Sequence, residues 1–235
     1  MFVNWMDYKG TQLQRHETKD CYRFATAHKA FDADGAPNAY HPNNTGLDDN
    51  ANAGYGARPK KGWKDVLVPD PNNQSVPYVQ KSGEFQGYFV SQTALKDIPK
   101  DDIDITKYVD SRHVPYLVFP GPFATMAGTG RLGDIGFAYN LANQKSSPFI
   151  IADIGPPDAT LGEMSIALGH ALGGQNINPR NGAGAPQGRI VYVIFRYSSA
   201  QDSHKRWPLS ALEIEAICHG HLQQIGGVQA AIDGL

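Results

Sequence analysis

The chain has 235 residues, of which 41% are hydrophobic and 19% are charged, enough for one sizeable hydrophobic core. The formal net charge of -2 and the lack of a Lys/Arg run argue against nucleic acid or an anionic membrane surface as a partner. No run of about 18 apolar residues is present, so no transmembrane helix is expected. The 25 glycines and 16 prolines argue against a helical bundle and favour a loop-rich, mainly β domain.

The first third of the sequence is polar and rich in turn residues. Residues 1–30 are predicted to be partly helical. Residues 31–85 contain many Gly, Pro, Asn and Asp residues with little periodicity, which predicts ordered loops. A long loop region in a compact domain is usually either functional or disordered. Its aromatic residues, Tyr40, Tyr55, Trp63 and Tyr78, favour a functional role.

The rest of the chain contains five segments that are rich in Val, Ile, Phe and Tyr and bounded by turn residues, which predicts strands. They are residues 87–95, 113–121, 132–141, 148–155 and 188–198. Apolar residues at spacings of three and four, ended by Gly173-Gly174, predict a helix over 161–172. A second helix is predicted over 210–225. Five or six short strands with few helices indicate a small barrel.

Two carboxylates stand out in the segment FIIADIGPPDATLGEMSIALGHALGG. Asp153 ends an apolar strand, and Glu163 follows ten residues later at the start of the predicted 161–172 helix. A strand end and a helix start are rigid, and a loop between them can bring both carboxyl groups to one cleft. Glycosidic bond cleavage needs one protonated and one ionised carboxyl group in that arrangement.

The same residues also have a purely structural interpretation. Thr160 and Glu163 fit a capping box, and Asp153 fits a residue that caps its own turn. A helix N-terminus would also favour the ionised form of Glu163, which is the wrong form for a general acid. Burial, or repulsion from Asp153, would then have to raise the pKa of Glu163 again.

The segments ADIGPP and ATLGEMSIALGHALGG resemble the signature of glycoside hydrolase family 75, the fungal-type chitosanases. The stretches DADGAPNAYHPNNTGLDDNANAGYG, GYFVSQTAL, YVDSRHVPYLVFPG and GTGRLGDIGFAYN are also similar, so the resemblance covers about residues 21–199. We expect a single catalytic domain over 1–235, in which residues 207–235 form a helical extension without a clear counterpart in that family. The resemblance implies hydrolase activity for the family-like core. It further implies inverting endo-hydrolysis of chitosan by Asp153 and Glu163, and secretion, although the chain begins without a signal-peptide pattern.

A more distant resemblance concerns the fold. A strand ending in Asp-x-Gly-Pro, a loop, an acidic residue and an Ala-rich helix is similar to the double-psi β-barrel of rare lipoprotein A, expansins and family 45 cellulases. This implies a mainly β (α+β) fold, a six-stranded double-psi-like barrel with long loops and a few helices. It also implies that Glu163 is the proton donor. Asp153 is then the base, or the group that stabilises an oxocarbenium-like transition state.

Chitosan carries protonated amines, so its cleft should offer further carboxylates and flat aromatic faces. The acidic candidates are Asp34, Asp48, Asp49 and Asp134, and the aromatic candidates are Tyr40 and Tyr88. Each has a structural alternative, because Asp is a common turn former and Tyr88 fits a core position. Arg180 could orient a carboxylate through a bidentate pair or fix a loop. We expect a monomer that needs no cofactor or metal.

Two other functions remain open from the sequence. One is a lytic enzyme acting on another wall polymer such as peptidoglycan, in which the additional aspartates would point away from the cleft. The other is a non-catalytic, expansin-like module that binds polysaccharide on a shallow surface. Cys21 and Cys218 could form a disulfide or remain free thiols. The Asp32-Ala33-Asp34-Gly35 run matches only the start of a calcium loop, and the later ligands are missing.

Overall fold

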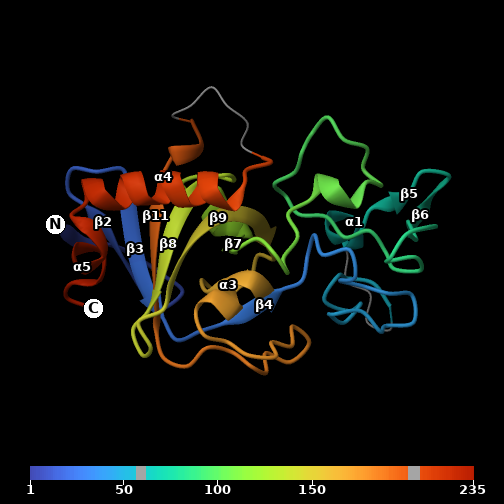
Figure 1. Cartoon of the computed structure of the whole chain (residues 1–235), viewed down its shortest axis with the longest axis horizontal. Coiled ribbons are helices and arrows are strands. Elements are labelled where there is room, and N and C mark those ends of the chain that lie inside the picture. Colours follow the sequence, from blue (N-terminus) through green and yellow to red (C-terminus); the bar gives the residue numbers. More distant parts are fainter. Residues whose placement is uncertain (57–61, 201–206) are drawn as a thin grey trace.

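The computed structural model describes residues 1–56, 62–200 and 207–235. Two parts lie side by side in Figure 1: a large sheet with helices on it, and a loop-rich part that holds α1 (Trp63–Val66), β5 (Pro69–Asp70) and β6 (Asn73–Pro77). The molecule is mainly β with a few helices, which confirms the predicted class.

The large sheet has nine strands in the order β1-β2-β3-β11-β8-β9-β7-β10-β4. Most neighbours are antiparallel, but β7 pairs with β9, and β10 with β4, in parallel. The strands are β1 (Phe2–Tyr8), β2 (Thr11–His16), β3 (Cys21–Thr26), β4 (Ala30–Asp32), β7 (Tyr116–Pro120), β8 (Ile135–Asn140), β9 (Ser146–Gly155), β10 (Glu163–Ser165) and β11 (Ile190–Phe195).

This sheet differs from the six-stranded barrel that the second resemblance implies. Over the described residues it has nine strands and does not close. The N-terminal β1–β2 hairpin extends one edge, and the short parallel pair β10–β4 forms the other. The edge strands β1 and β4 therefore do not pair with each other.

The prediction of partial helix over residues 1–30 is wrong, because this segment forms β1, β2 and β3. Lys9 and Gly10 have φ angles of 49° and 82°, the positive values that a tight hairpin turn needs. Alternate residues of the hairpin also pack inward: Leu13 is fully buried, and Tyr8 packs edge-on against Phe123. The polar composition reflects one solvent-facing side of a hairpin at the edge of the sheet.

Both faces of the central strands are buried, which explains their continuous apolar runs. In β11, Ile190, Tyr192 and Ile194 belong to one core, whereas Val191, Val193 and Phe195 belong to a second. The second core is covered by α4 (Ala211–Gln224), which runs across the strands in Figure 1, and by α5 (Gly227–Ile232) near the C-terminus. The first core is closed by α2 (Gly121–Ala124) and α3 (Ile166–Ala171).

Four of the five predicted strands are confirmed as β7, β8, β9 and β11, and the predicted 210–225 helix is confirmed as α4. The predicted strand over 87–95 is wrong, since only isolated bridges such as Val79–Phe89 and Leu67–Ser91 occur there. This loop-rich part also contains the 3-10 helix η1 (Ile105–Lys107), and a second one, η2 (Ser198–Ala200), follows β11. Residues 57–61, within the predicted loop region, lie outside the described residues.

The loop-rich part has its own small core, as expected of ordered loops. Tyr40, Leu67 and Phe89 are buried there, and Tyr55 and Trp63 pack against them. Cys21 and Cys218 are buried as free thiols, and Cys218 Sγ donates a hydrogen bond to the Gly136 carbonyl. None of the described helices has the length and apolarity of a transmembrane span.

Candidate functional site

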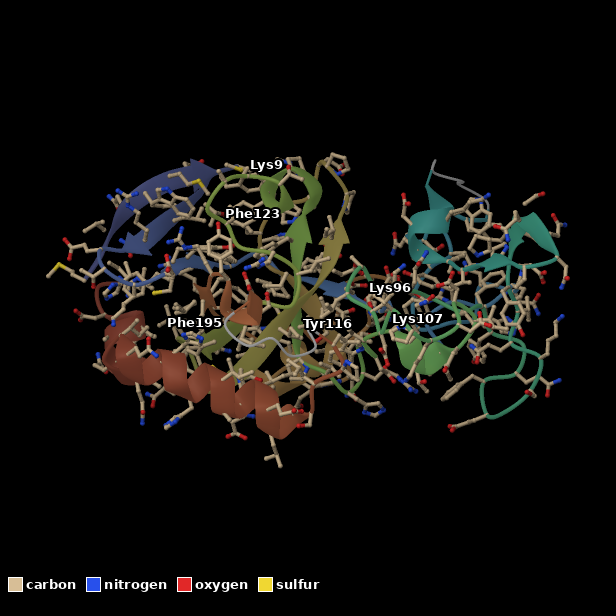
Figure 2. All side chains as sticks on the ribbon, turned by 90° about the horizontal axis from the view of Figure 1, so that it is seen from above. Lys9, Lys96, Lys107, Tyr116, Phe123 and Phe195 are labelled. Carbon is tan, nitrogen blue, oxygen red and sulfur yellow. The ribbon has the colours of Figure 1, made fainter. Side chains whose placement is uncertain are left out.

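A cleft of about 1030 Å³ lies where the large sheet meets the loop-rich part. Its walls come from β4, the end of β9, β10, and segments within residues 40–54, 62–66, 92–96 and 179–182. In Figure 2, Tyr116 lies within the sheet and Lys96 on the side of the sheet that faces the loops. The cleft is lined by six acidic side chains: Asp32, Asp34, Asp48, Asp65, Asp153 and Glu163.

Asp153 lies near the end of β9, directly after a bulge. Leu117 pairs with Ile151 but Val118 pairs with Asp153, so Ala152 is an extra residue in β9. Bulges of this kind re-aim the side chain that follows. The Asp153 Oδ1 atom accepts hydrogen bonds from the backbone N–H groups of Ile154 at 2.8 Å and Ala94 at 3.0 Å. The carboxyl group is therefore fixed both to its own turn and to the loop-rich part.

Glu163 lies in β10 and not at a helix N-terminus. Helix α3 begins only at Ile166, and its N-cap is Ser165, whose Oγ accepts from the Leu168 N–H. The predicted start at 161 and the Thr160–Glu163 capping box are wrong, because residues 163–165 pair with β4 instead. The expected effect of a helix N-terminus on Glu163 therefore does not arise.

Gly155 brings Glu163 next to the turn that carries Asp153. A Cβ atom on Gly155 would lie 3.1 Å from Glu163 Oε2, so this carboxyl group lies directly over the strand end. Asp153 and Gly155 are two residues apart on β9, and such residues share a face of a strand. Both carboxyl groups thus line the same cleft.

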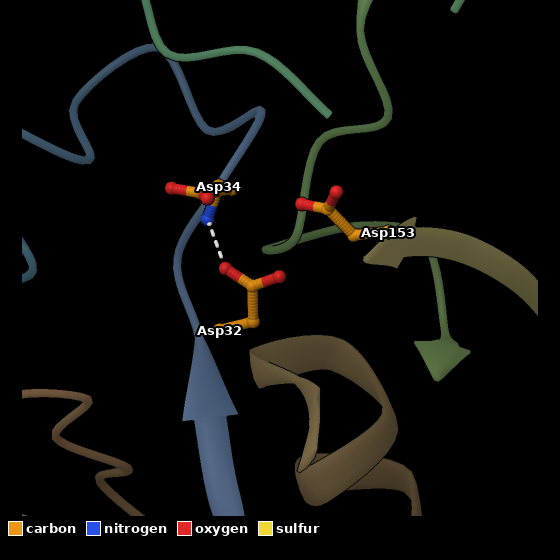
Figure 3. A group of neighbouring side chains, drawn as sticks. All are labelled: Asp32, Asp34 and Asp153. Atoms are coloured by element: carbon orange, nitrogen blue, oxygen red, sulfur yellow. Dashed lines mark hydrogen bonds between the residues drawn. The ribbon is translucent and has the colours of Figure 1, made fainter. Parts of the chain in front are cut away.

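The sequence interpretation missed Asp32 as a site residue. Asp32, Asp34 and Asp153 lie with carboxylate oxygens within 4.8 Å of one another (Figure 3). Asp32 Oδ1 accepts from the Asp34 N–H at 2.7 Å, and Asp34 Oδ1 accepts from the hydroxyls of Tyr40 at 2.9 Å and Ser91 at 3.0 Å. The only sequence signal was the Asp-Ala-Asp-Gly run, which is equally typical of a turn.

The spacing of these three carboxyl groups is compatible with a cation. Within the described ranges, it is the one such group of three or more His, Cys, Asp or Glu side chains. We assign no metal to them.

The buried carboxyl groups that line the cleft have raised pKa values. Burial, followed by the charges of Asp32 and Asp48, raises the pKa of Glu163 to about 8. Burial raises the pKa of Asp32 to about 6, whereas the hydrogen bond from the Asp34 N–H acts in the opposite direction. Burial thus favours the protonated form of Glu163, which is the form that a general acid requires.

The pKa values of Asp153 and Asp34 are also raised. Burial raises the pKa of Asp153 well above its ordinary value, and the Asp32 charge adds to this, while the backbone N–H groups of Ile154 and Ala94 act in the opposite direction. For Asp34, burial and then the charges of Asp32 and Asp153 raise the pKa. Like charges this close in a buried site cannot all be ionised.

Three of the predicted binding residues besides Asp34 also line the cleft. Tyr40 lies in its wall, with its hydroxyl 2.9 Å from Asp34. Asp48 is buried and accepts hydrogen bonds from Asn52 and the Asp49 N–H. Arg180 fixes a loop through the carbonyls of Asn44 and Gly46. Burial raises the pKa of Asp48, and the charge of Arg180 acts in the opposite direction.

The other three predicted binding residues do not line the cleft. Asp49 closes its own turn by accepting from the Ala51 N–H. Tyr88 packs edge-on against His41 and Phe85. Asp134 is fully buried elsewhere and accepts from the backbone of residues 131, 197 and 199, so its role is structural. The structure therefore separates turn formers from cleft residues that look alike in the sequence.

Positively charged side chains also line the cleft. Lys29, Lys64, Lys96 and Arg180 line the same cleft. Lys29 Nζ donates to the carbonyls of Ala27 and Gly188, and Lys64 lies over the Trp63 ring. The cleft thus presents carboxyl groups at its centre and cations at other positions along its walls.

No protein-family model matches the chain, and a search of the curated proteins gave no match.

Proposed function

We propose that the chain is an endo-acting glycoside hydrolase that cleaves β-1,4-linked chitosan with inversion. The observation that carries the proposal is the pairing, in one cleft, of Glu163, whose pKa is raised to about 8, with a neighbouring group of aspartates that includes Asp153. Glycoside hydrolysis requires this combination of a proton-holding acid and a second carboxyl group. The resemblance to family 75 in the segments around both residues points to the same pair.

In this proposal, Glu163 gives its proton to the leaving glycosidic oxygen as the bond to the anomeric carbon breaks. A water molecule attacks that carbon from the opposite face. The carboxylate form of Asp153 takes up the proton that this water releases. Inversion needs room for the water, with the two carboxyl groups about 6.5–9.5 Å apart. Tyr40, Asp34 and Asp48 line the space in which the sugar residues and their amines would bind.

The experiment measures reducing ends and product anomers after incubation with chitosans of graded acetylation, chitin, carboxymethyl-cellulose and peptidoglycan. We expect hydrolysis of chitosan with inverted products, and a loss of about 10²–10⁴-fold in kcat for Glu163→Gln and for Asp153→Asn. The matched control is Glu84→Gln, at an exposed residue outside the cleft. Undiminished activity of Glu163→Gln would end the proposal.

A second candidate function is favoured by the cations in the cleft walls. Lys29, Lys64, Lys96 and Arg180 suit a polysaccharide that carries carboxylates, such as peptidoglycan, better than a uniformly cationic chain. The same substrate panel separates the two functions. Hydrolysis of peptidoglycan without hydrolysis of chitosan would favour the second.

A further inference from the structure

The segment of residues 91–95 contacts both the loop-rich part and the bulge of β9. Two successive backbone N–H groups of this segment hold the bulge. The Ala94 N–H donates to Asp153 Oδ1 at 3.0 Å. The Leu95 N–H donates at 2.8 Å to the carbonyl of Ala152, which is the extra residue of the bulge. One short segment thus fixes both the bulge and the carboxyl group that follows it.

Thr93 fixes the conformation of this segment from inside the protein. It is 1% exposed, and its hydroxyl group donates to the Leu95 carbonyl at 2.6 Å and accepts from the Val109 N–H at 3.1 Å. Its methyl group lies against Gly35, where a Cβ atom would come within 3.0 Å of it. Gly35 directly follows Asp34. The two branches of Thr93 therefore contact the segment that holds the bulge and the turn that carries Asp34.

The same segment also holds a second acidic residue of the cleft. Ser91, two residues before Thr93, is 2% exposed, and its hydroxyl group donates to Asp34 Oδ1 at 3.0 Å. Asp34 and Asp153 have carboxylate oxygens within 4.8 Å of each other (Figure 3). A shift of residues 91–95 would therefore move the hydrogen-bond partners of two neighbouring carboxyl groups.

Removal of the Thr93 hydroxyl group would leave two backbone groups without a partner. Leu95 is 5% exposed and Val109 is fully buried, so water does not readily replace the hydroxyl at the Leu95 carbonyl and the Val109 N–H. Residues 93–95 would then move to find other partners. Displacement of a catalytic group by about 1 Å can cost on the order of 100-fold in rate.

We propose that Thr93 is a positioning residue for Asp153. Its hydroxyl group holds the Ala94 and Leu95 N–H groups on the bulge, and these N–H groups set the direction of the Asp153 carboxyl group in the cleft. Thr93 transfers no proton itself, because its hydroxyl group already has both partners within the protein. The role in catalysis rests on the proposed function, whereas the role of Thr93 in holding the two N–H groups does not.

The first test is amide hydrogen exchange followed by NMR, which needs no substrate. We expect the wild-type Ala94 and Leu95 amides to be protected. Thr93→Val keeps the shape of the side chain without the hydroxyl, and it should speed exchange of both amides about fivefold or more. Thr129→Val is the matched control, because Thr129 is fully buried, donates to the Phe123 carbonyl at 2.8 Å and lies outside the cleft. It should leave the exchange of both amides unchanged.

The second test is steady-state hydrolysis of chitosan. We expect Thr93→Val to lower kcat about 10- to 100-fold with KM within about twofold of wild type, because a displaced carboxyl group affects the chemical step and not substrate binding. Thr93→Ser retains the hydroxyl and should recover kcat to within about threefold of wild type. Thr129→Val should leave kcat within about twofold of wild type, since it removes an equally buried hydroxyl elsewhere.

Unprotected Ala94 and Leu95 amides in the wild type would overturn the inference before any variant is made, as would unchanged exchange in Thr93→Val. An equal loss of kcat in Thr129→Val, or in Thr93→Ser, would reject the positioning role. Thr93→Ala replaces Thr93→Val if that variant does not fold. A wild type that hydrolyses no polysaccharide rejects the proposed function and the role in catalysis, while the exchange experiment still decides whether Thr93 holds the two N–H groups.

Discussion

At the scale of single residues, burial of Glu163 in the cleft raises its pKa and makes its ionised form unfavourable for stability. Glu163 lies over Gly155 and within the electrostatic influence of Asp32 and Asp48, so its ionised form is costly in the folded state. In the unfolded chain this glutamate is hydrated and ionises at its ordinary pKa. Functional sites often contain such groups, because catalysis needs a protonation state that the solvent alone would not give.

The pH dependence of stability should therefore differ between wild type and Glu163→Gln. The folded-state pKa is raised, so the proton on Glu163 stabilises the fold below the unfolded value, and this stabilisation is lost as pH rises from about 4.5 to about 8. We expect Glu163→Gln to gain at least about 1.4 kcal/mol relative to wild type between pH 4 and pH 9, which corresponds to one pKa unit. Urea unfolding at both pH values measures it, with Glu84→Gln as control. Parallel pH profiles of the two proteins would contradict this prediction.

At the scale of elements, the junction between β10 and α3 positions Glu163. Ser165 ends the strand and caps the helix, and its hydroxyl oxygen makes three hydrogen bonds. It accepts from the Leu168 N–H and the Tyr116 N–H and donates to the Val114 carbonyl. One fully buried side chain thus connects β10, α3 and β7 two residues after the proposed acid.

Removal of this hydroxyl should destabilise the protein. We expect Ser165→Ala to lower the free energy of unfolding by about 1–3 kcal/mol, because it leaves buried backbone groups without partners. Ser75→Ala, which removes an exposed hydroxyl that donates to Asn73, is the control and should change the free energy of unfolding by less than about 0.5 kcal/mol. The two variants are compared by urea denaturation, and equal midpoints would show that the junction does not depend on Ser165.

At the scale of the whole molecule, the C-terminal helices belong to the core of the sheet. Ile214, Cys218 and Leu222 recur every four residues on α4 and pack on the second core together with Val191 and Val193. Arg23 on β3 donates to the carbonyls of residues 231 and 233, which ties α5 to the same sheet. The extension at 207–235 therefore covers an apolar face that would otherwise meet water.

Substitution within this helix should accordingly destabilise the whole fold. We expect Leu222→Ala to lower the free energy of unfolding by about 2–5 kcal/mol, through lost burial and the cavity that remains. The control is Leu212→Ala on the same helix, where the side chain is 77% exposed, with a change within about 0.5 kcal/mol. Thermal or urea unfolding followed by tryptophan fluorescence measures both. A Leu222→Ala midpoint equal to wild type would mean that α4 is dispensable.

The sequence alone was sufficient where local pattern and burial agree. β11 is apolar on both faces because both faces are covered. Its run of Val, Ile, Tyr and Phe therefore predicts a strand from the sequence alone. Helix α4 carries its own signals, a regular apolar spacing and a capping box between Ser210 and Glu213. Asp153 was placed at a strand end by the same kind of local pattern.

The tertiary structure decided what depends on partners far along the chain. Residues 163–165 have helical spacing, yet they form a strand because β4, more than 130 residues earlier, offers a pairing edge. Asp32, Asp49 and Asp134 are equivalent as turn formers, but only Asp32 faces the cleft, whereas Asp134 binds backbone around residue 197. The acidic cluster forms because the fold brings Asp32 and Asp34, from the end of β4, close to Asp153 of β9, and burial there raises their pKa values. Neither long-range pairing nor the dielectric surroundings of a carboxyl group is encoded within a short segment.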